Sequence, residues 1–372
     1  MNQNGNVNPL IPGKKILAIF GFVSIRNFPQ ITEILEENIM LFTNQIAEII
    51  HIVCDSYHGI INKNLGDCFL IIWKLKDQDN LIQINKQEEI SIFNISHCQN
   101  YTDLALIGFL KSQSNIYKLS MTKKFKNSLI KIQKTNPNFS LKLGFGLHFG
   151  WAIEGAIGSN FKIDASYLSP NVNLASRLEN ATKQYGIQLL VSGAVYRLLS
   201  NQTKQYLRHI DRVTVKGSEQ PMDLYTCDMD CNLIEIQQLI KQSNENQNEP
   251  NKKILKYVQR MKKQTRLKKI IKNQIQVHNL FLKDNDFLIM RQTYTQEFFN
   301  YFHQGINNYL DGYWKDAKIK FEEAQLILNK EYEYIQKDKL IDGPINTLDK
   351  YMKNFNYQSP DNWKGYRELS EK

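Results

Sequence analysis

The sequence predicts an α+β protein with a β-α-β-β-α-β core domain and a smaller, all-helical tail. From Ile16 to about Asp228, apolar strand-like runs alternate with amphipathic segments, and a polar stretch with a proline at 241–253 then interrupts this alternation. A chain of 372 residues also exceeds one ordinary hydrophobic core. We therefore expect four segments: an N-terminal arm (1–12), a main domain (13–230) with an insertion loop at about 76–100, a linker with a basic helix (231–280), and a helical tail (281–372).

The composition is that of a globular protein outside the secretory pathway. Hydrophobic residues make up 42% and charged residues 23% of the chain, and no apolar run reaches the roughly 18 residues of a membrane span. The N-terminus is polar and has no signal-peptide pattern. The five cysteines are odd in number and lack paired C-x-x-C spacing, which predicts reduced thiols in a cytoplasmic protein and no metal site at Cys227 and Cys231.

The main domain is expected to form one sheet with its helices on one face. The pattern predicts a buried strand at 14–23, a long helix at 31–57 and a hairpin at 59–75. A further helix is expected at about 101–118. The glycine-rich stretch 141–159 is interpreted as two strands around a turn.

Five blocks, in order, then point to a family: "FGFVSIRNF", "NKNLGDCFLIIW", "GFGLHFGWAIEGAIGS", "IDASYLSPNVNLASRLENATKQYG" and "IDRVTVKGSEQPMDLYT". This series resembles the class III adenylyl and guanylyl cyclase catalytic domain, most closely its protist-type members, over about residues 13–228. The resemblance implies a class III cyclase-like fold with a ferredoxin-like βαββαβ core. It also implies descent from enzymes that convert ATP or GTP to a cyclic nucleotide and pyrophosphate.

The resemblance implies a two-metal site for Mg²⁺ or Mn²⁺, held by two aspartates. The second of these matches Asp67, in the hairpin turn, whereas the first position holds Ser24. A neutral hydroxyl supplies neither the charge nor the bridging geometry that a pair of hard cations needs. Pro29, where the family usually has Thr or Ser, is a second departure and lacks a backbone N–H. Metal binding is therefore in doubt.

Other family positions are retained. Asn173 and Arg177 lie four apart on one face of a predicted helix and match the family's ribose-orienting Asn and transition-state Arg. Lys63 matches a lysine that contacts adenine in adenylyl forms. Its partner aspartate is replaced by Ser166, so the choice between ATP and GTP stays open. Lys216 matches a triphosphate-binding lysine in an altered loop, and a solvated strand-end lysine is the alternative.

The family works as dimers, with carboxylates from one subunit and Asn and Arg from the other. A homodimer of this chain would have Asp67 without its partner in both sites. The first expectation is therefore a catalytically impaired homologue that acts as a structural or regulatory subunit of a larger assembly, in a cytoskeletal or ciliary setting. The alternative is one half of a heterodimeric nucleotidyl cyclase that contributes Asn173 and Arg177. An autonomous cyclase ranks third.

The tail adds a possible protein-binding function. Residues 298–328 have the spacing of one tetratricopeptide (TPR) repeat at Tyr301, Gly305, Ala317, Phe321 and Ala324. One repeat cannot bury its apolar face alone, so we expect it to dock on the main domain, on neighbouring helices or on a protein partner. Near the C-terminus, Trp363 and Tyr366 are expected to act as anchors.

The segment 252–272 is strongly basic in a chain of net charge +10. Ile254, Val258 and Met261 lie on one helical stripe, so a solvated helix with a packed seam is one interpretation. Docking on an acidic surface is the other. No nucleic-acid-binding fold accompanies the charge, so nucleic acid is not expected as a partner.

Overall fold

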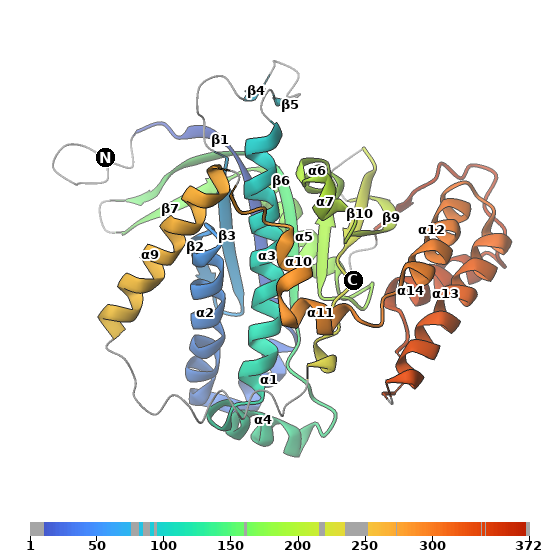
Figure 1. The fold of residues 1–372 in the computed structure, drawn as a ribbon, viewed down its shortest axis with the longest axis horizontal. Helices are drawn as coiled ribbons and strands as arrows, with labels where there is room; N and C mark the ends of the chain where they lie inside the picture. Colours follow the sequence, from blue (N-terminus) through green and yellow to red (C-terminus); the bar gives the residue numbers. More distant parts are fainter. Residues whose placement is uncertain are drawn as a thin grey trace.

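The computed structural model describes residues 11–75, 82–84, 90–92, 95–159, 162–215, 220–234, 252–272, 274–335, 337–338 and 340–369 (Figure 1). Most of the predicted N-terminal arm, much of the insertion loop and the polar linker at 241–251 lie outside these residues. None of the helices in the described part of the chain is long and apolar enough to cross a membrane.

In the described residues one mixed sheet organises the main domain. Its strand order is β11-β9-β10-β8-β6-β1-β3-β2, and β7 pairs with the far half of β6. The β6–β8 and β9–β11 pairs are parallel and the other pairs are antiparallel. The strands are β1 (Lys14–Ile25), β2 (Ile60–Leu65), β3 (Cys68–Lys74), β6 (Leu143–Ser159), β7 (Lys162–Leu168), β8 (Leu189–Ser192), β9 (Arg208–Thr214), β10 (Met222–Thr226) and β11 (Arg367–Glu368). In the insertion, β4 (Ile82–Ile84) pairs with β5 (Ile90–Ile92).

One face of the sheet is covered by α2 (Ile39–Ser56) and α3 (Ile95–Ser120), and α1 (Phe28–Leu35) and α4 (Lys123–Thr135) pack against these two helices at one end of the domain (Figure 1). Alternate residues of β1, such as Ile19 and Val23, point into the core beneath these helices. The prediction of a single helix at 31–57 is wrong, because two helices, α1 and α2, occupy this segment. Glu36 has a positive φ (50°), so α1 ends there, and a short 3-10 turn (Glu36–Asn38) precedes α2.

The two helices predicted within the β-α-β-β-α-β core, α2 and α3, lie on one face of the sheet as expected, but a further helix, α5 (Pro170–Ala181), covers the other face. The intervening β1 residues, Ala18 and Phe20, face the other way and pack with Val172 and Ala175 of α5. The side chains of β1 are apolar on both faces of the sheet, so both faces must be covered by other elements. Helix α5 does this on the second face.

The predicted pair of strands at 141–159 is instead one 17-residue strand, β6. Its glycines make room for a helix and form no turn within it. A Cβ at Gly146 would lie 2.5 Å from the backbone oxygen of Ala175, and one at Gly150 would lie 2.2 Å from the Asn171 side chain. Glycine therefore allows α5 to pack directly on the β6 backbone.

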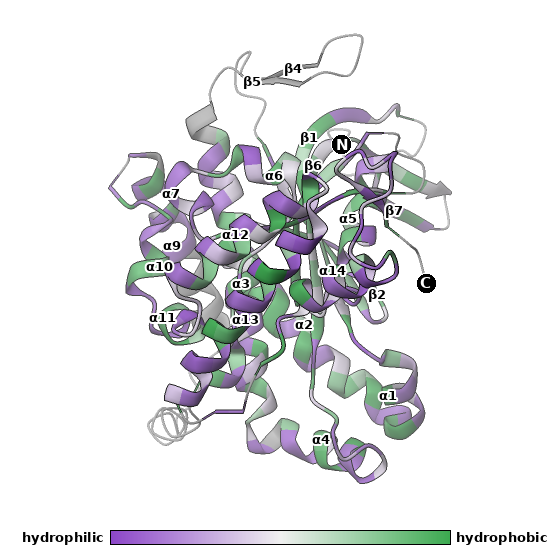
Figure 2. Ribbon diagram, turned by 90° about the vertical axis from the view of Figure 1, so that its right-hand side faces the viewer, coloured by the Kyte–Doolittle hydropathy of each residue, from purple (hydrophilic) through white to green (hydrophobic). Residues whose placement is uncertain are grey.

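The predicted helical C-terminal region is confirmed. Helices α12 (Gln296–Leu310), α13 (Trp314–Tyr334) and α14 (Gly343–Lys353) pack as a cluster beside β9 and β10 (Figure 1). Gly305 allows the ring of Phe321 to pack against α12, because a Cβ there would lie 2.6 Å from that ring. The apolar faces of these helices share a core with Leu190, Ile210 and other residues of the sheet. The tail is therefore built onto the main domain, and Figure 2 shows its helices with polar and apolar residues interspersed.

A buried ion network joins the tail to the sheet. Arg208 of β9 donates to Asp228 at 2.6 Å and to Asp342, at the start of α14, at 2.7 Å. Its guanidinium also lies 4.2 Å from the ring centre of Phe302. Trp363, predicted as an anchor, donates from its indole nitrogen to the backbone oxygen of Leu310 at 2.9 Å.

The basic segment forms α9 (Lys252–Ile271), which lies against α2. Of the predicted seam, Met261 is exposed, and the side chains of Ile254 and Val258 lie outside the described residues; Ile270, near the end of the helix, is buried. Lys263 forms an ion pair with Asp55, and Arg266 stacks on the ring of Tyr57. Short helices complete the described chain: α6 (Gly193–Leu198), α7 (Asn201–Lys204), the 3-10 turn η2 (Cys231–Leu233), α10 (Asn279–Lys283) and α11 (Asn285–Arg291).

Candidate nucleotide site

The end of β1 and the turn between β2 and β3 form the centre of the candidate site. Ser24 pairs with Cys68 across the two strands, and the backbone N–H of Ile25 donates to the Asp67 carbonyl at 3.1 Å. Gly66 has φ +72°, a conformation that suits glycine in this tight turn. The chain therefore holds Ser24 and Asp67 at neighbouring positions.

The Ser24 side chain is engaged inside the protein. It is only 5% exposed, and its hydroxyl donates to Glu179 Oε1 at 2.5 Å. Glu179 comes from the buried face of α5, where the close approach at Gly144 and Gly146 places it beside β1 and β6. Burial raises the pKa of Glu179, and the hydrogen bond from Ser24 and the charge of Arg26 oppose that rise.

Sequence reasoning missed Glu179, although the sequence held a signal for it. Val172, Ala175 and Glu179 recur at intervals of three and four residues, so an acidic side chain falls on the apolar stripe of α5. A carboxylate on such a stripe needs polar partners in the core. Ser24 is one of these partners, and the nearby Arg26 donates to Thr182, at the end of the same helix.

The donors at this site do not fit two divalent ions. In the described residues no group of three or more His, Cys, Asp or Glu side chains is placed to hold a metal. The two carboxylates around Ser24 are Asp67 and Glu179, and Glu179 is bound by Ser24. Burial raises the pKa of the Cys68 thiol to about 12, so it is a neutral group. Hard cations such as Mg²⁺ take several oxygen ligands each, and this set is too small for a pair.

The two residues predicted to contact the base lie together. Lys63, in β2, donates from Nζ to the Ser166 hydroxyl, in β7, at 3.3 Å. Ser166 is buried and Lys63 is half-buried. The structure therefore brings a cationic donor and a hydroxyl together from strands that are far apart in sequence.

Asn173 and Arg177 lie on the outer side of α5. Asn173 is exposed and Arg177 is half-buried, whereas Val172, Ala175 and Glu179 face the sheet. The helix begins with Ser169, whose side chain accepts a hydrogen bond from Asn171 N, and with Pro170 at its first position. The same helix thus carries Glu179 inward to Ser24 and presents Asn173 outward.

Three further residues remain: Lys216 and Pro29, which the sequence analysis named, and the buried His148. Lys216 lies outside the described residues. His148 is buried and makes hydrogen-bond contacts with Ser192 at 2.9 Å and Asn171 at 3.2 Å, and burial lowers its pKa to about 4. Pro29 occupies the first turn of α1, where a helix does not use the missing N–H.

The chain is similar in sequence to known cyclases. The family model "Adenylate and Guanylate cyclase catalytic domain" matches residues 15–228, more than half of the chain. An adenylate cyclase of Anabaena cylindrica is 27% identical over 206 residues, which cover 55% of this chain and 35% of that protein. The terminal-differentiation-specific adenylate cyclase of Dictyostelium discoideum is 26% identical over 214 residues, or 57% of this chain and 8% of that protein. The chain thus spans about a third or less of the length of these relatives.

Solved structures of the same kind are similar at low identity. The adenylyl cyclase CyaB from P. aeruginosa is 21% identical, with a TM-score of 0.42, over 58% of this chain and 95% of that one. A bacterial light-regulated adenylyl cyclase is 21% identical, with a TM-score of 0.44, over 60% and 56% of the two chains. On the match of the family model over residues 15–228, the chain belongs to the class III adenylate and guanylate cyclase catalytic domain family.

Proposed function

We propose that this chain is a cyclase-family protein that is catalytically impaired on its own and acts as a structural or regulatory subunit. The observation that supports this is the Ser24–Glu179 hydrogen bond. This hydrogen bond lies where the family resemblance assigns a metal-binding aspartate. It also occupies an oxygen of the Glu179 carboxylate in a contact within the protein. A cyclase needs charge at this point to hold the cations that stabilise the pentavalent transition state.

A second proposal is that the chain forms one half of a heterodimeric cyclase. The exposed Asn173 and the half-buried Arg177, on the outer side of α5, favour it because a partner subunit can reach that side. The contact between Lys63 and Ser166 gives the same half-site a donor and an acceptor for a base. We propose ATP as the nucleotide, since the Anabaena and Dictyostelium relatives are adenylate cyclases.

A complementation assay tests the heterodimer. The partner is the catalytic domain of the Anabaena enzyme, with its own counterparts of Asn173 and Arg177 replaced by Ala. Its two aspartates are intact, yet it should be inactive alone. Adding this chain should restore cyclic AMP formation, and adding Arg177→Ala should not. Asn180→Ala, an exposed change on the same helix, is the control. No restoration by the unaltered chain would contradict the heterodimer.

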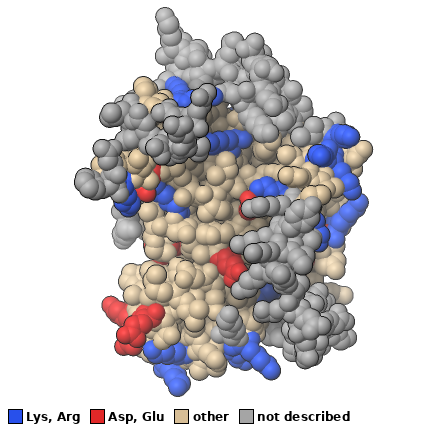
Figure 3. Space-filling view, turned by 90° about the vertical axis from the view of Figure 1, so that its left-hand side faces the viewer, with Lys and Arg blue, Asp and Glu red and all other residues tan. Residues whose placement is uncertain are grey.

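We further propose that α9 provides a surface for an acidic partner. Lys262, Lys268 and Lys269 are exposed, whereas Lys263 and Arg266 are engaged with α2 and with the residues that follow it. Basic side chains gather along the edge of the molecule that α9 forms (Figure 3). A protein partner for the TPR-like tail and a cytoskeletal or ciliary location remain predictions from the sequence.

A further inference from the structure

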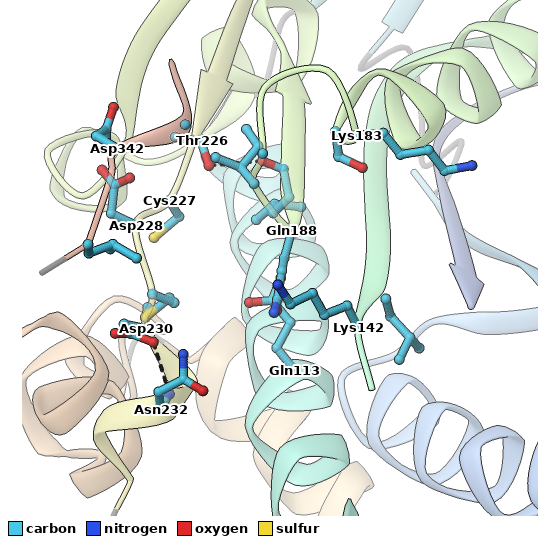
Figure 4. Close-up of a pocket in the computed structure, with 18 of the residues that line it drawn as sticks. Gln113, Lys142, Lys183, Gln188, Thr226, Cys227, Asp228, Asp230, Asn232 and Asp342 are labelled. Atoms are coloured by element: carbon cyan, nitrogen blue, oxygen red, sulfur yellow. Dashed lines mark hydrogen bonds between the residues drawn. The ribbon is translucent and has the colours of Figure 1, made fainter. Parts of the chain in front are cut away.

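A pocket of about 410 Å³ lies where the cyclase-family domain meets the C-terminal region. Its lining comes from α3, from the residues before β6, from the segment after β10 and from the residues before α14. Figure 4 shows Lys142 and Gln113 together on one side, with Asp228 and Asp230 on the other. The pocket therefore has a side rich in hydrogen-bond donors opposite an acidic side.

Four buried polar atoms of residues that line this pocket have no hydrogen-bond partner within the described protein: Gln113 Nε2, Arg26 Nη1, Arg208 Nε and Asp228 Oδ2. Gln113 is 4% exposed, and its Nε2 donor makes no hydrogen bond. Asp228 is 5% exposed; its Oδ1 binds Arg208, and its Oδ2 acceptor makes no hydrogen bond. An unpartnered buried polar group destabilises the folded state, so such groups usually face a ligand or an ordered water. Here a donor and an acceptor line one cavity.

The charges of the two sides differ in sign. On the acidic side, the carboxylates of Asp228, Asp230 and Asp342 outnumber the guanidinium groups of Arg208 and Arg291, which contact that segment. On the opposite side, Lys142 accompanies Gln113. Arg26 also lines the pocket, and its Nη1 atom is buried without a partner. The donor side therefore favours an anionic group, and the acidic side favours a cationic one.

From this arrangement we infer that the pocket binds a small zwitterion, a molecule with an ammonium group and a carboxylate. The ammonium faces Asp228, and the carboxylate faces Gln113, Lys142 and Arg26. Gln113 Nε2, Arg26 Nη1 and Asp228 Oδ2 then each gain a charge-assisted hydrogen bond, which is stronger than a bond between neutral groups. A purely anionic ligand would leave Asp228 Oδ2 unpartnered, and a purely cationic ligand would do the same to Gln113 Nε2. This site is separate from the Ser24–Asp67 region and does not depend on the proposed cyclase role.

The test is thermal unfolding of the full chain with a homologous series of zwitterions: glycine, 4-aminobutyrate, 6-aminohexanoate, lysine and glutamate, each at 10 mM. Acetate, ethylammonium and inorganic phosphate are the single-charge controls. At least one zwitterion should raise the Tm by about 2 °C or more, because a ligand that binds only the folded state stabilises it. Calorimetry should then show one binding site.

Two variants locate the binding. Gln113→Leu should leave the Tm of the free protein unchanged or higher, because it removes an unpartnered polar group, and it should abolish the ligand-induced shift. With Lys142→Met, at least a tenfold higher ligand concentration should be needed for the same rise in Tm. Lys134→Met, which also replaces an exposed lysine, should not change the required concentration. The inference is overturned if no zwitterion shifts the Tm, which would mean that the pocket holds water only. It is also overturned if phosphate or acetate acts equally well, or if Gln113→Leu keeps the full shift.

Discussion

The hydroxyl of Ser24 donates to a carboxylate oxygen of Glu179 at 2.5 Å, across 155 residues of sequence. Strand β1 brings the serine to the edge of the candidate site, and α5 brings the glutamate through the gap left by the glycines of β6. The position that the family resemblance assigns to a metal ligand is therefore part of an internal hydrogen bond.

Replacing Ser24 with Asp should make the protein sensitive to divalent metal. A carboxylate at this position would meet that of Glu179, and two like charges in a buried site destabilise each other. We expect Ser24→Asp to melt below Ser24→Asn in EDTA and to regain stability in Mn²⁺. Thermal unfolding with calorimetric Mn²⁺ titration measures both effects.

The result of that substitution also separates two histories of the site. Mn²⁺-dependent cyclic AMP formation by Ser24→Asp would mean that one substitution silenced it. Metal and nucleotide binding without product would mean that it has been lost in several places. If Ser24→Asp and Ser24→Asn respond to Mn²⁺ alike, Ser24 does not occupy the missing ligand position.

His148 should make the protein less stable in mild acid. Its pKa falls from 6.5 to about 4 in the folded state because burial disfavours the charged imidazolium. The contribution of His148 to the free energy of unfolding, about 3 kcal/mol, is therefore fully present above pH 6.5. It is lost as the pH falls toward 4. Urea unfolding between pH 7 and 4 should show a weaker pH dependence for His148→Gln. His51→Gln, on α2, is the control for loss of a histidine. If the free energy of unfolding depends on pH equally in the wild type and in His148→Gln, His148 does not cause the loss of stability in acid.

Arg208 should be essential for attachment of the tail. It is fully buried between Asp228 and Asp342, so Arg208→Met leaves two buried carboxylates without their cation. Breaking such a buried network costs about 3–5 kcal/mol. Chemical denaturation measures this loss, and Lys131→Met, in an exposed ion pair with Glu36, should cause a much smaller one. Similar losses in the two variants would contradict the structural role of the network.

Reversing the exposed charges of α9 should weaken association without unfolding the protein. The triple change of Lys262, Lys268 and Lys269 to Glu leaves the Lys263–Asp55 ion pair intact. Exposed charges contribute little to stability and much to encounter with a charged partner. Binding to an acidic poly-glutamate surface, followed by surface plasmon resonance, should fall at least tenfold. The same reversal at Lys134, Lys315 and Lys353 should change it far less, and equal losses would mean that only net charge matters.

Local patterns in the sequence predicted the elements around the site, but not their long-range packing. The buried strand β1 and the hairpin turn that carries Asp67 were readable from neighbouring residues. The glycines of β6 suggested a turn, because sequence alone does not show that α5 packs against them.

The inward position of Glu179 has the same cause. Its partner, Ser24, is distant in sequence, and only the packing of α5 on β6 brings the two together. The pocket at the junction with the tail likewise depends on Arg208 and Asp342, which meet across 134 residues of chain. Such contacts between distant segments follow from the fold and from no local pattern.

The most direct test of the central claim is the rate at which the purified chain, alone, converts ATP to cyclic AMP in the presence of Mn²⁺. The catalytic domain of the Anabaena enzyme, assayed at the same concentration, provides the reference. Because Ser24 cannot replace a metal-binding carboxylate, we predict turnover at least about a hundredfold below that reference, given that even residues that only orient metal ligands are worth 10–100-fold. Turnover comparable to the reference would contradict the account.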